Sequence, residues 1–232
     1  MISFVVPAYN EERWLGPTLA AIHAAALATG EPYEIVVADD GSTDGTAAIA
    51  ESGGARVVRV HNRQIAATRN AGARAAAGEF LVFVDADTRV DAALVAEALA
   101  ALRGGAVGGG APVRLDRAPG WAHAFMRAFV PLYFRLARWA AGCFVFCTRV
   151  AFEAAGGFDE RYYASEEIGF SRALKAQGRF VMLRNFVTSS SRKLDGRTAA
   201  DMLWMIARLA AAGRAGLRAR TGATAFWYPE RR

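Results

Sequence analysis

Residues 79–91 read EFLVFVDADTRVD, an apolar run that stops abruptly at two carboxylates, Asp85 and Asp87. A short continuous apolar run bounded by polar residues is typical of a strand buried on both faces of a parallel sheet. Residues two apart in an extended backbone point the same way, and two neighbouring like charges disfavour joint ionisation. The stretch therefore predicts a buried strand whose paired acids need a cation beside them. The alternative is an ordinary capped turn before a helix at Asp91.

An apolar strand followed by a helical stretch occurs four times in the first half of the chain. The predicted strands are residues 2–10, 33–40, 55–62 and 79–87, and the helical stretches are 11–30, 41–54, 64–78 and 91–105. Two of these helices are expected to end at a glycine, Gly30 and Gly78. The alternation predicts an α/β fold, with a mostly parallel sheet and helices on both faces.

Polar side chains follow each of the four predicted strands. These clusters are Asn10-Glu11, Asp39-Asp40, Asn62-Arg63 and Asp85 with Asp87. Ligands of parallel sheets bind beyond the carboxyl ends of the strands, so we expect the clusters to converge on one edge. A carboxylate there can accept hydrogen bonds from a base or a ribose hydroxyl, whereas Thr43 or Asp44 can simply cap the next helix.

Composition and charge narrow the class of protein. The chain has 232 residues, 53% hydrophobic and 22% charged, which favours one globular domain. Its net charge of +6 suits an anionic lipid, a phosphorylated substrate or a nucleic acid. The arginines do not cluster with aromatic residues in a known nucleic-acid module, so we expect no nucleic-acid partner. Two cysteines, Cys143 and Cys147, fit reduced buried thiols and a cytoplasmic location.

The strand–helix rhythm changes after about residue 104. We expect the second half to extend the same sheet and to lay a wall over its edge. Two stretches, residues 121–142 and 201–220, combine apolar residues with arginines. They predict either helices that cover the core or amphipathic helices that meet an anionic membrane surface. We expect no signal peptide, because residues 1–12 read as a strand, and no transmembrane helix, because no uncharged apolar run is long enough to cross a bilayer.

Four motifs together resemble the family-two glycosyltransferases. They are VVPAYNEE at residues 5–12, DDGSTDGT at 39–46, TRNAGARAAAGEFLVFVDADT at 68–88 and GGFDE…SEEIGFSRALKAQG at 156–178. Their order and spacing match over residues 1 to about 185. The resemblance implies a GT-A fold, a Rossmann-like sheet in a single domain over residues 1–232. Residues 1–103 would form the nucleotide-binding half, and residues 104–232 the acceptor-binding half with a C-terminal amphipathic helix.

The resemblance also implies roles for the donor-binding residues. Pro7, Tyr9 and Glu11 would line the nucleoside pocket, Asp39 would contact the base with Asp40 beside it, Arg69 would lie near the nucleotide or diphosphate, Asp85 would touch the ribose or sugar, and Asp87 would ligate a divalent metal, Mg²⁺ or Mn²⁺. Asn70 and Gly72 would let the helix that carries Arg69 pack closely. The implied partners are a UDP- or GDP-sugar and an acceptor hydroxyl, for which a lipid-linked or cell-envelope acceptor at the inner face of a membrane is one expectation.

The acidic pair Glu166-Glu167 would supply the catalytic base of an inverting transfer. The resemblance places the base at the second acid, Glu167, with Glu166 as its near competitor, although the chain has Gly169 where the family has another acid. The alternative role is the first turn of a helix, where the helix dipole favours acids and Ser165 would be the N-cap.

The chain also departs from the family at its C-terminal polar stretch. GT-A enzymes often use a late histidine as a metal ligand, but the only histidines are His23, His61 and His123. Arg192 and Lys193 occupy that stretch and would offset diphosphate charge, or would form a solvated basic loop. A catalytically silent module that binds a nucleotide sugar or a lipid head group stays open as an alternative function.

Overall fold

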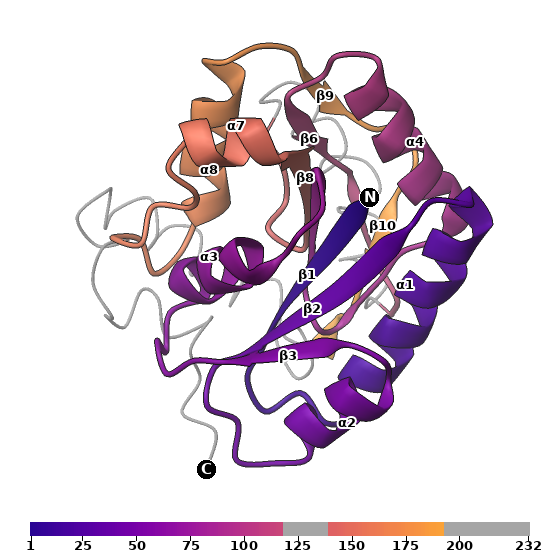
Figure 1. Ribbon diagram of the computed structural model, residues 1–232, viewed down its shortest axis with the longest axis vertical. Coiled ribbons are helices and arrows are strands. Elements are labelled where there is room, and N and C mark those ends of the chain that lie inside the picture. The colour runs from indigo at the N-terminus through magenta and orange to yellow at the C-terminus, as the bar shows by residue number, and fades with distance from the viewer. Residues whose placement is uncertain (118–138, 193–232) are drawn as a thin grey trace.

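A seven-stranded sheet forms the centre of the computed structural model, which describes residues 1–117 and 139–192 (Figure 1). Its strand order is β3-β2-β1-β4-β8-β6-β9. The strands are β1 (Ile2–Ala8), β2 (Tyr33–Asp39), β3 (Arg56–Arg59), β4 (Phe80–Val84), β6 (Gly108–Gly110), β8 (Phe144–Thr148) and β9 (Phe180–Met182). Only β8 runs antiparallel to its neighbours. The predicted mostly parallel sheet is confirmed, and the second half extends it as expected.

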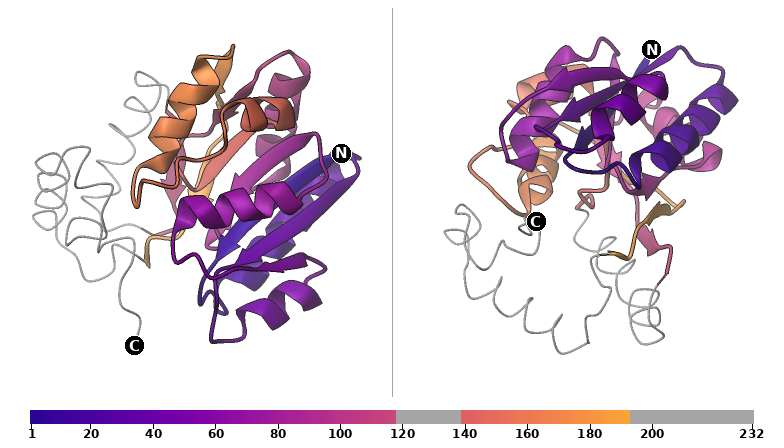
Figure 2. Two further views of the ribbon diagram at one scale, coloured as in Figure 1. Left: turned by 60° about the vertical axis from the view of Figure 1, so that its left-hand side comes forward. Right: turned by 90° about the horizontal axis from the view of Figure 1, so that it is seen from below.

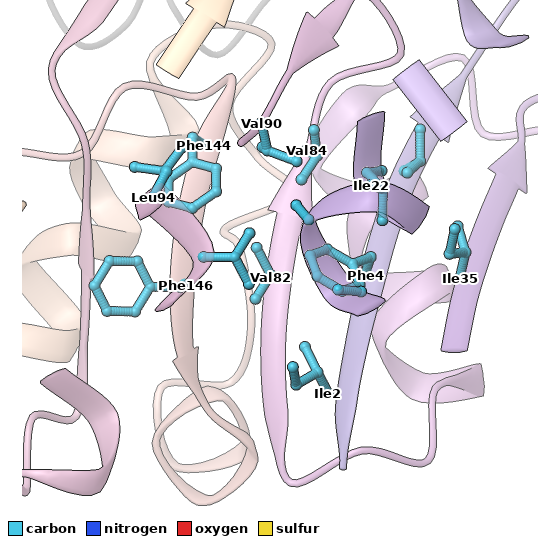
Figure 3. Packing of buried hydrophobic residues seen from close by; sticks show 14 of the residues in the cluster. Ile2, Phe4, Ile22, Ile35, Val82, Val84, Val90, Leu94, Phe144 and Phe146 are labelled. Atoms are coloured by element: carbon cyan, nitrogen blue, oxygen red, sulfur yellow. The ribbon is translucent and has the colours of Figure 1, made fainter. Parts of the chain in front are cut away.

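Helices cover both faces of this sheet (Figures 1 and 2). They are α1 (Leu15–Thr29), α2 (Thr46–Ser52), α3 (Ile65–Ala75), α4 (Ala92–Arg103), α7 (Arg149–Ala154) and α8 (Glu166–Lys175). One buried cluster joins the sheet to α1 and α4, with Phe4 and Val82 against Ile22 and Leu94 (Figure 3). The other joins the sheet to α3, α7 and α8. Because alternate residues of the central strands enter opposite clusters, β4 is apolar throughout and β1 and β2 are largely so.

The carboxyl ends of β1 and β4 separate where the strand order reverses. Their pairing ends at Val5 and Phe83, whereas β1 continues beside β2 as far as the pair of Ala8 and Asp39. In open α/β sheets, this reversal is where ligands bind. The residues that follow β1, β2 and β4 therefore border one crevice.

A second sheet has three strands in the order β5-β10-β7, and its first strand, β5, follows β4 in the chain. Its strands are β5 (Thr88–Arg89), β7 (Val113–Leu115) and β10 (Val187–Ser189). The backbone N–H of Ser190, which follows β10, donates to the carbonyl of Asp87 at 3.1 Å. This small sheet thus brings residues 187–192 to the acids at the end of β4.

Glycine ends one helix as predicted and not the other. Gly30 closes α1 in the left-handed conformation (φ 69°). Helix α3 ends instead at Ala76, which has an extended backbone. Gly78 serves close packing: a Cβ on it would lie 2.5 Å from the hydroxyl of Ser3. Gly72 lets α3 pack closely on the sheet, as predicted, since a Cβ on it would lie 2.6 Å from the side chain of Val5.

Several expectations concern residues that the structure does not describe. The C-terminal amphipathic stretch 201–220, most of the stretch 121–142, His123 and Lys193 lie outside the described ranges. Within the described ranges, no helix has the length and apolar character needed to cross a bilayer. Cys143 and Cys147 are free thiols, and burial raises the pKa of Cys147.

Candidate active site

The two acids after β2 have different surroundings. Oδ1 of Asp40 accepts the backbone N–H groups of Asn62 and Arg63, at 2.6 and 2.9 Å. Its Oδ2 accepts the N–H of Gln64 and the hydroxyl of Thr68, at 3.2 and 2.9 Å. Both oxygens are therefore bonded within the protein. These contacts favour a role for Asp40 in holding the loop that enters α3, over the predicted position beside a bound base.

Asp39, unlike Asp40, can still accept a hydrogen bond from a ligand. Its Oδ1 accepts the N–H of Ser42 at 3.1 Å, whereas Oδ2 has no hydrogen-bond partner within the described part of the chain. Tyr9 follows β1, and the guanidinium of Arg63 lies 4.1 Å from the centre of its ring. Pro7 is buried in β1, paired with Ala38 of β2. The crevice thus offers a carboxylate oxygen near a stacked aromatic ring.

The turn after β4 sends its two acids to different partners. The N–H of Thr88 donates to the carbonyl of Asp85 at 3.0 Å, so the chain turns at Asp85–Thr88 before it enters β5. The expected extended backbone, with both carboxylates pointing the same way, is therefore wrong. Asp85 pairs with Arg69, and Asp87 pairs with Arg192. Each acid has its own cation.

Arg69 lies on α3 and is 1% exposed. Its Nη2 donates to Asp85 and to the carbonyl of Gly142, both at 2.8 Å, and its Nη1 donates to Glu166. Burial by itself would lower the pKa of Arg69, but the charges of Asp85 and Glu166 outweigh it and raise that pKa. The guanidinium is committed to protein oxygens, so the geometry favours a supporting role over the predicted contact with a nucleotide or diphosphate.

Glu166 and Glu167 form the first turn of α8 and face different groups. Glu166 is buried against Arg69. Glu167 forms no ion pair among the described residues; burial, and then the charge of Glu166, raises its pKa. Ser165 occupies the predicted N-cap position, in a left-handed conformation (φ 63°), but its side chain makes no capping hydrogen bond, so the position is confirmed and the side-chain cap is not. Glu167 is the half-buried carboxylate that stays available.

Arg192 joins the acids that follow β1 and β4. Its Nη1 and Nη2 donate to the two oxygens of Glu11 at 2.7 and 2.6 Å, and its Nε donates to Asp87 at 2.7 Å. The guanidinium lies 5.6 Å from the ring centre of Trp14. Burial would lower the pKa of Arg192, but Glu11 and Asp87 raise it. Arg192 is therefore largely buried between two acids and does not lie in a solvated basic loop, which was the alternative for it.

The acids around Arg192, Glu11 and Asp87, are the candidate ligands for a divalent metal. In the described ranges, no three His, Cys, Asp or Glu side chains form a group that could hold an ion. His23 lies elsewhere, between the hydroxyl of Tyr33 and the carbonyl of Gly53, in the packing role expected for it. Mg²⁺ is commonly held by one or two carboxylates together with substrate phosphates. Glu11 and Asp87, which share one guanidinium, fit a metal that arrives with a diphosphate.

Some site residues carry no clear signal in their own motifs. Trp14 and Asp116 line a small cleft beside Asp87, together with Thr18, Arg89 and Ser190. Gln64, the N-cap of α3, and Asn70 of α3 are buried polar residues that bond to residues 158–162. Polar residues on the apolar face of a predicted helix need partners, and that requirement was the available signal.

Comparison with known proteins locates the family of the chain. The family model described as Glycosyl transferase family 2 matches residues 3–156. An undecaprenyl-phosphate 4-deoxy-4-formamido-L-arabinose transferase of Pseudomonas aeruginosa is 39% identical over 94 residues, which are 38% of this chain and 28% of that protein. A validoxylamine A glucosyltransferase of Streptomyces hygroscopicus subsp. limoneus is 35% identical over 110 residues, 45% of this chain and 24% of that protein. The chain thus spans about a quarter of the length of these relatives.

Solved structures share the fold. TarS 1-349 of S. aureus in complex with UDP matches with a TM-score of 0.66 and 19% identity, over 82% of this chain and 60% of that one. The mannosyltransferase PcManGT of Pyrobaculum calidifontis, in complex with GDP-Man and Mn²⁺, matches with a TM-score of 0.66 and 21% identity, over 89% and 60%. These matches support the predicted GT-A architecture.

Proposed function

The chain belongs to glycosyl transferase family 2 and is a glycosyltransferase, and from this premise we propose an inverting transfer from a UDP- or GDP-sugar to an acceptor hydroxyl. One observation carries the proposal. An acid with a spare oxygen, Asp39, follows β2, an acid beside a cation, Asp87, follows β4, and α8 carries a carboxylate with a raised pKa, Glu167, on which the charge of Asp85 also acts. These are the groups needed to bind a nucleoside, offset a diphosphate and accept a proton.

The donor would lie along the crevice between β1 and β4. Asp39 would accept a hydrogen bond from the base through its spare oxygen, next to Pro7 and Tyr9. Asp85 is partly exposed and shares the guanidinium of Arg69 with Glu166; it would face the ribose or the sugar. Three of the matching structures contain UDP, UDP-GlcNAc or GDP-Man, and this supports a nucleotide-sugar donor.

The leaving diphosphate would be stabilised at Asp87. A divalent cation, Mg²⁺ or Mn²⁺, would be held there with Glu11 and would neutralise charge that develops on the diphosphate. Arg192 lies between the same two acids, and a metal that takes its place there would release the guanidinium to offset diphosphate charge. Mn²⁺ in the structure of the Pyrobaculum enzyme supports a divalent cation here.

Glu167 would remove the proton from the acceptor hydroxyl. A general base works best when its pKa lies near the operating pH, and burial moves Glu167 in that direction. Glu166 is a poorer candidate, because its carboxylate is bonded to Arg69. Attack from the face opposite the leaving group inverts the anomeric centre.

A lipid-linked acceptor at the cytoplasmic face of a membrane is the acceptor that we propose. The Pseudomonas relative is named for undecaprenyl phosphate, and the apolar, arginine-containing stretches 121–142 and 201–220 suit an anionic surface. Flotation with anionic liposomes at low salt should carry the protein upward. A protein that stays at the bottom would remove the membrane part of the proposal and leave the sugar transfer standing.

The Glu167→Gln variant tests the chemistry. It should bind UDP with Mn²⁺ as the wild type does, by titration calorimetry, and should lose roughly 10²–10⁴-fold in transfer. Glu153→Gln is a matched control, because Glu153 is an exposed acid on α7. Diphosphate release should first be measured with a panel of UDP-, GDP- and TDP-sugars. Binding without any release would favour the catalytically silent module, and equal turnover by Glu167→Gln would refute the base assignment.

A further inference from the structure

Three buried polar side chains of α3 and its N-cap reach toward the segment that leads into α8. Gln64 is 5% exposed, and Arg69 and Asn70 are each 1% exposed. A polar group that is buried without a hydrogen bond is costly, so the partners of these groups define where they hold the protein. All three bond to the segment between Phe158 and Glu166.

Asn70 binds both polar backbone groups of Phe158. Its Oδ1 accepts the N–H of Phe158, and its Nδ2 donates to the carbonyl of Phe158, both at 2.9 Å. The same Nδ2 donates to the carboxylate of Glu160 at 2.9 Å. Gly157, with φ 76°, permits this approach, since a Cβ there would lie 2.6 Å from Oδ1 of Asn70. One amide therefore pairs with the loop as a neighbouring strand would.

Gln64 holds the same loop two residues further on. Its Oε1 accepts the N–H of Ala67 at 2.6 Å and so caps the start of α3. Its Nε2 donates to the carbonyls of Glu160 and Tyr162, at 3.1 and 2.5 Å. The start of the helix and the loop are thus fixed by one side chain.

The loop in turn fixes α8. The ring of Phe158 packs against Phe170 of α8, with ring centres 4.2 Å apart, and against Phe83 of β4 at 5.0 Å. Arg69 binds Glu166, the residue before Glu167. The position of Glu167 therefore depends on contacts made by α3, although no side chain of α3 is a proton acceptor for the proposed reaction.

The N-terminal part of α3 also contacts the residues of the proposed nucleoside pocket. Asp40 binds the N–H of Gln64 and the hydroxyl of Thr68, and Asp40 directly follows Asp39. One helix therefore links the acid proposed to contact the base with the segment that carries the proposed catalytic base.

We propose that Gln64 and Asn70 are positioning residues, which hold the loop 157–163 so that Glu167 meets the acceptor hydroxyl at the correct distance from a donor anchored at Asp39. The proposal rests on the glycosyl transfer proposed above. A displacement of about 1 Å at a reacting group can cost on the order of 10²-fold in rate without weakening binding.

The test replaces single amides by the matching acids. Asn70→Asp keeps the acceptor for Phe158 but turns the donating side into an oxygen that faces Glu160. We expect kcat to fall about 10- to 100-fold, with the KM for the donor within about twofold of wild type. Gln64→Glu keeps the cap on Ala67, loses the donor to the loop, and should show the same split. Gln177→Glu is the control, since that exposed amide binds a carbonyl of α7 near the far end of α8.

A second variant separates positioning from general damage. Asn70→Asp combined with Glu160→Gln restores a donor opposite the new carboxylate, so kcat should recover about tenfold over Asn70→Asp alone. An unchanged kcat in both amide variants, or a kcat and donor KM that worsen together without rescue, would overturn the positioning role while the wild-type activity upholds the transfer. A wild type that releases no diphosphate from any donor would remove the proposed function and this inference with it.

Discussion

Two arginines divide the acids of the turn after β4, and their settings differ. Arg69 is sealed beneath the site, with Asp85, Glu166 and the carbonyl of Gly142 as its partners. Arg192 lies at the edge with an 18% exposed side chain, and its partners are Glu11 and Asp87, the carboxylates proposed to meet a metal. One guanidinium is therefore sealed in the core, and the other is partly open to solvent, where we propose that a metal can take its place between the two acids. We therefore expect Asp85 to act mainly on stability, besides its proposed contact with the ribose or sugar, and Asp87 to act mainly on metal and diphosphate binding.

Arg69→Met should produce the largest effect. Glu166 would remain buried and Asp85 half-buried without their cation, and breaking such a pair costs about 3–5 kcal/mol in the free energy of unfolding. For a chain of this size, the melting temperature should fall on the order of 10 °C in a thermal scan. Arg59→Met is the control, because its exposed pair with Glu51 should contribute at most about 1 kcal/mol. Equal losses of unfolding free energy in the two variants would show that Arg69 contributes no more to stability than an exposed ion pair does.

Asn substitutions at the two acids of the turn should separate their roles. Asp87→Asn should weaken the binding of UDP with Mn²⁺ about tenfold, or ~1.4 kcal/mol, by calorimetry. Asp85→Asn should instead act mainly on stability, lowering the free energy of unfolding by about 1–3 kcal/mol, because Arg69 loses a charged partner in the interior. If both variants changed the same quantity to the same extent, the division between the two arginines would fail.

The fold was readable from the sequence because the strands are buried on both faces. Runs such as residues 80–84 are apolar throughout, and glycines or polar residues interrupt them where the chain turns. The place of the site followed from the same pattern, since parallel strands deliver their carboxyl ends to one edge. Local capping was less readable. Ser165 has the right side chain for a cap but adopts a left-handed backbone, and α3 ends at Ala76, two residues before the glycine that packs against Ser3.

The partners of the acids could not be read from the sequence. Asp39 and Asp40 are identical neighbours, yet the loop 62–64 and Thr68 consume both oxygens of Asp40 alone. Likewise, the sequence predicted a cation for Asp85 and Asp87 but could not choose two arginines that lie 16 and 105 positions away. These contacts depend on how helices and loops pack, and local pattern carries little information about that.

The pH dependence of transfer should show how Glu166, the ion-pair partner of Arg69, affects the pKa of Glu167. Burial and the charge of Glu166 raise the pKa of Glu167 to about 8 from an ordinary value of 4.5. A base must be ionised, so kcat/KM should fall about tenfold per pH unit below that pKa. Glu166→Gln removes the smaller of the two causes and should move this limb to lower pH by part of a unit. The same raised pKa means that stability contributed by neutral Glu167 is present below about pH 4.5 and is lost as pH rises through about 8. A limb that stays in place in Glu166→Gln would remove that carboxylate as a cause.

Arg192→Gln should produce the smallest effect, and it tests the exchangeable side of the comparison. Without the guanidinium, Glu11 and Asp87 face each other with no shared cation, so the donor-free protein should bind Mn²⁺ roughly three- to tenfold more tightly, as measured from the free ion by electron paramagnetic resonance. Arg63→Gln removes the same charge from above the ring of Tyr9 and should leave Mn²⁺ affinity as it is. Weaker or equal Mn²⁺ binding in Arg192→Gln would mean that the guanidinium does not compete for these acids. If that variant also lost as much stability as Arg69→Met, both arginines would be structural, and the edge of the sheet would be as closed as its interior.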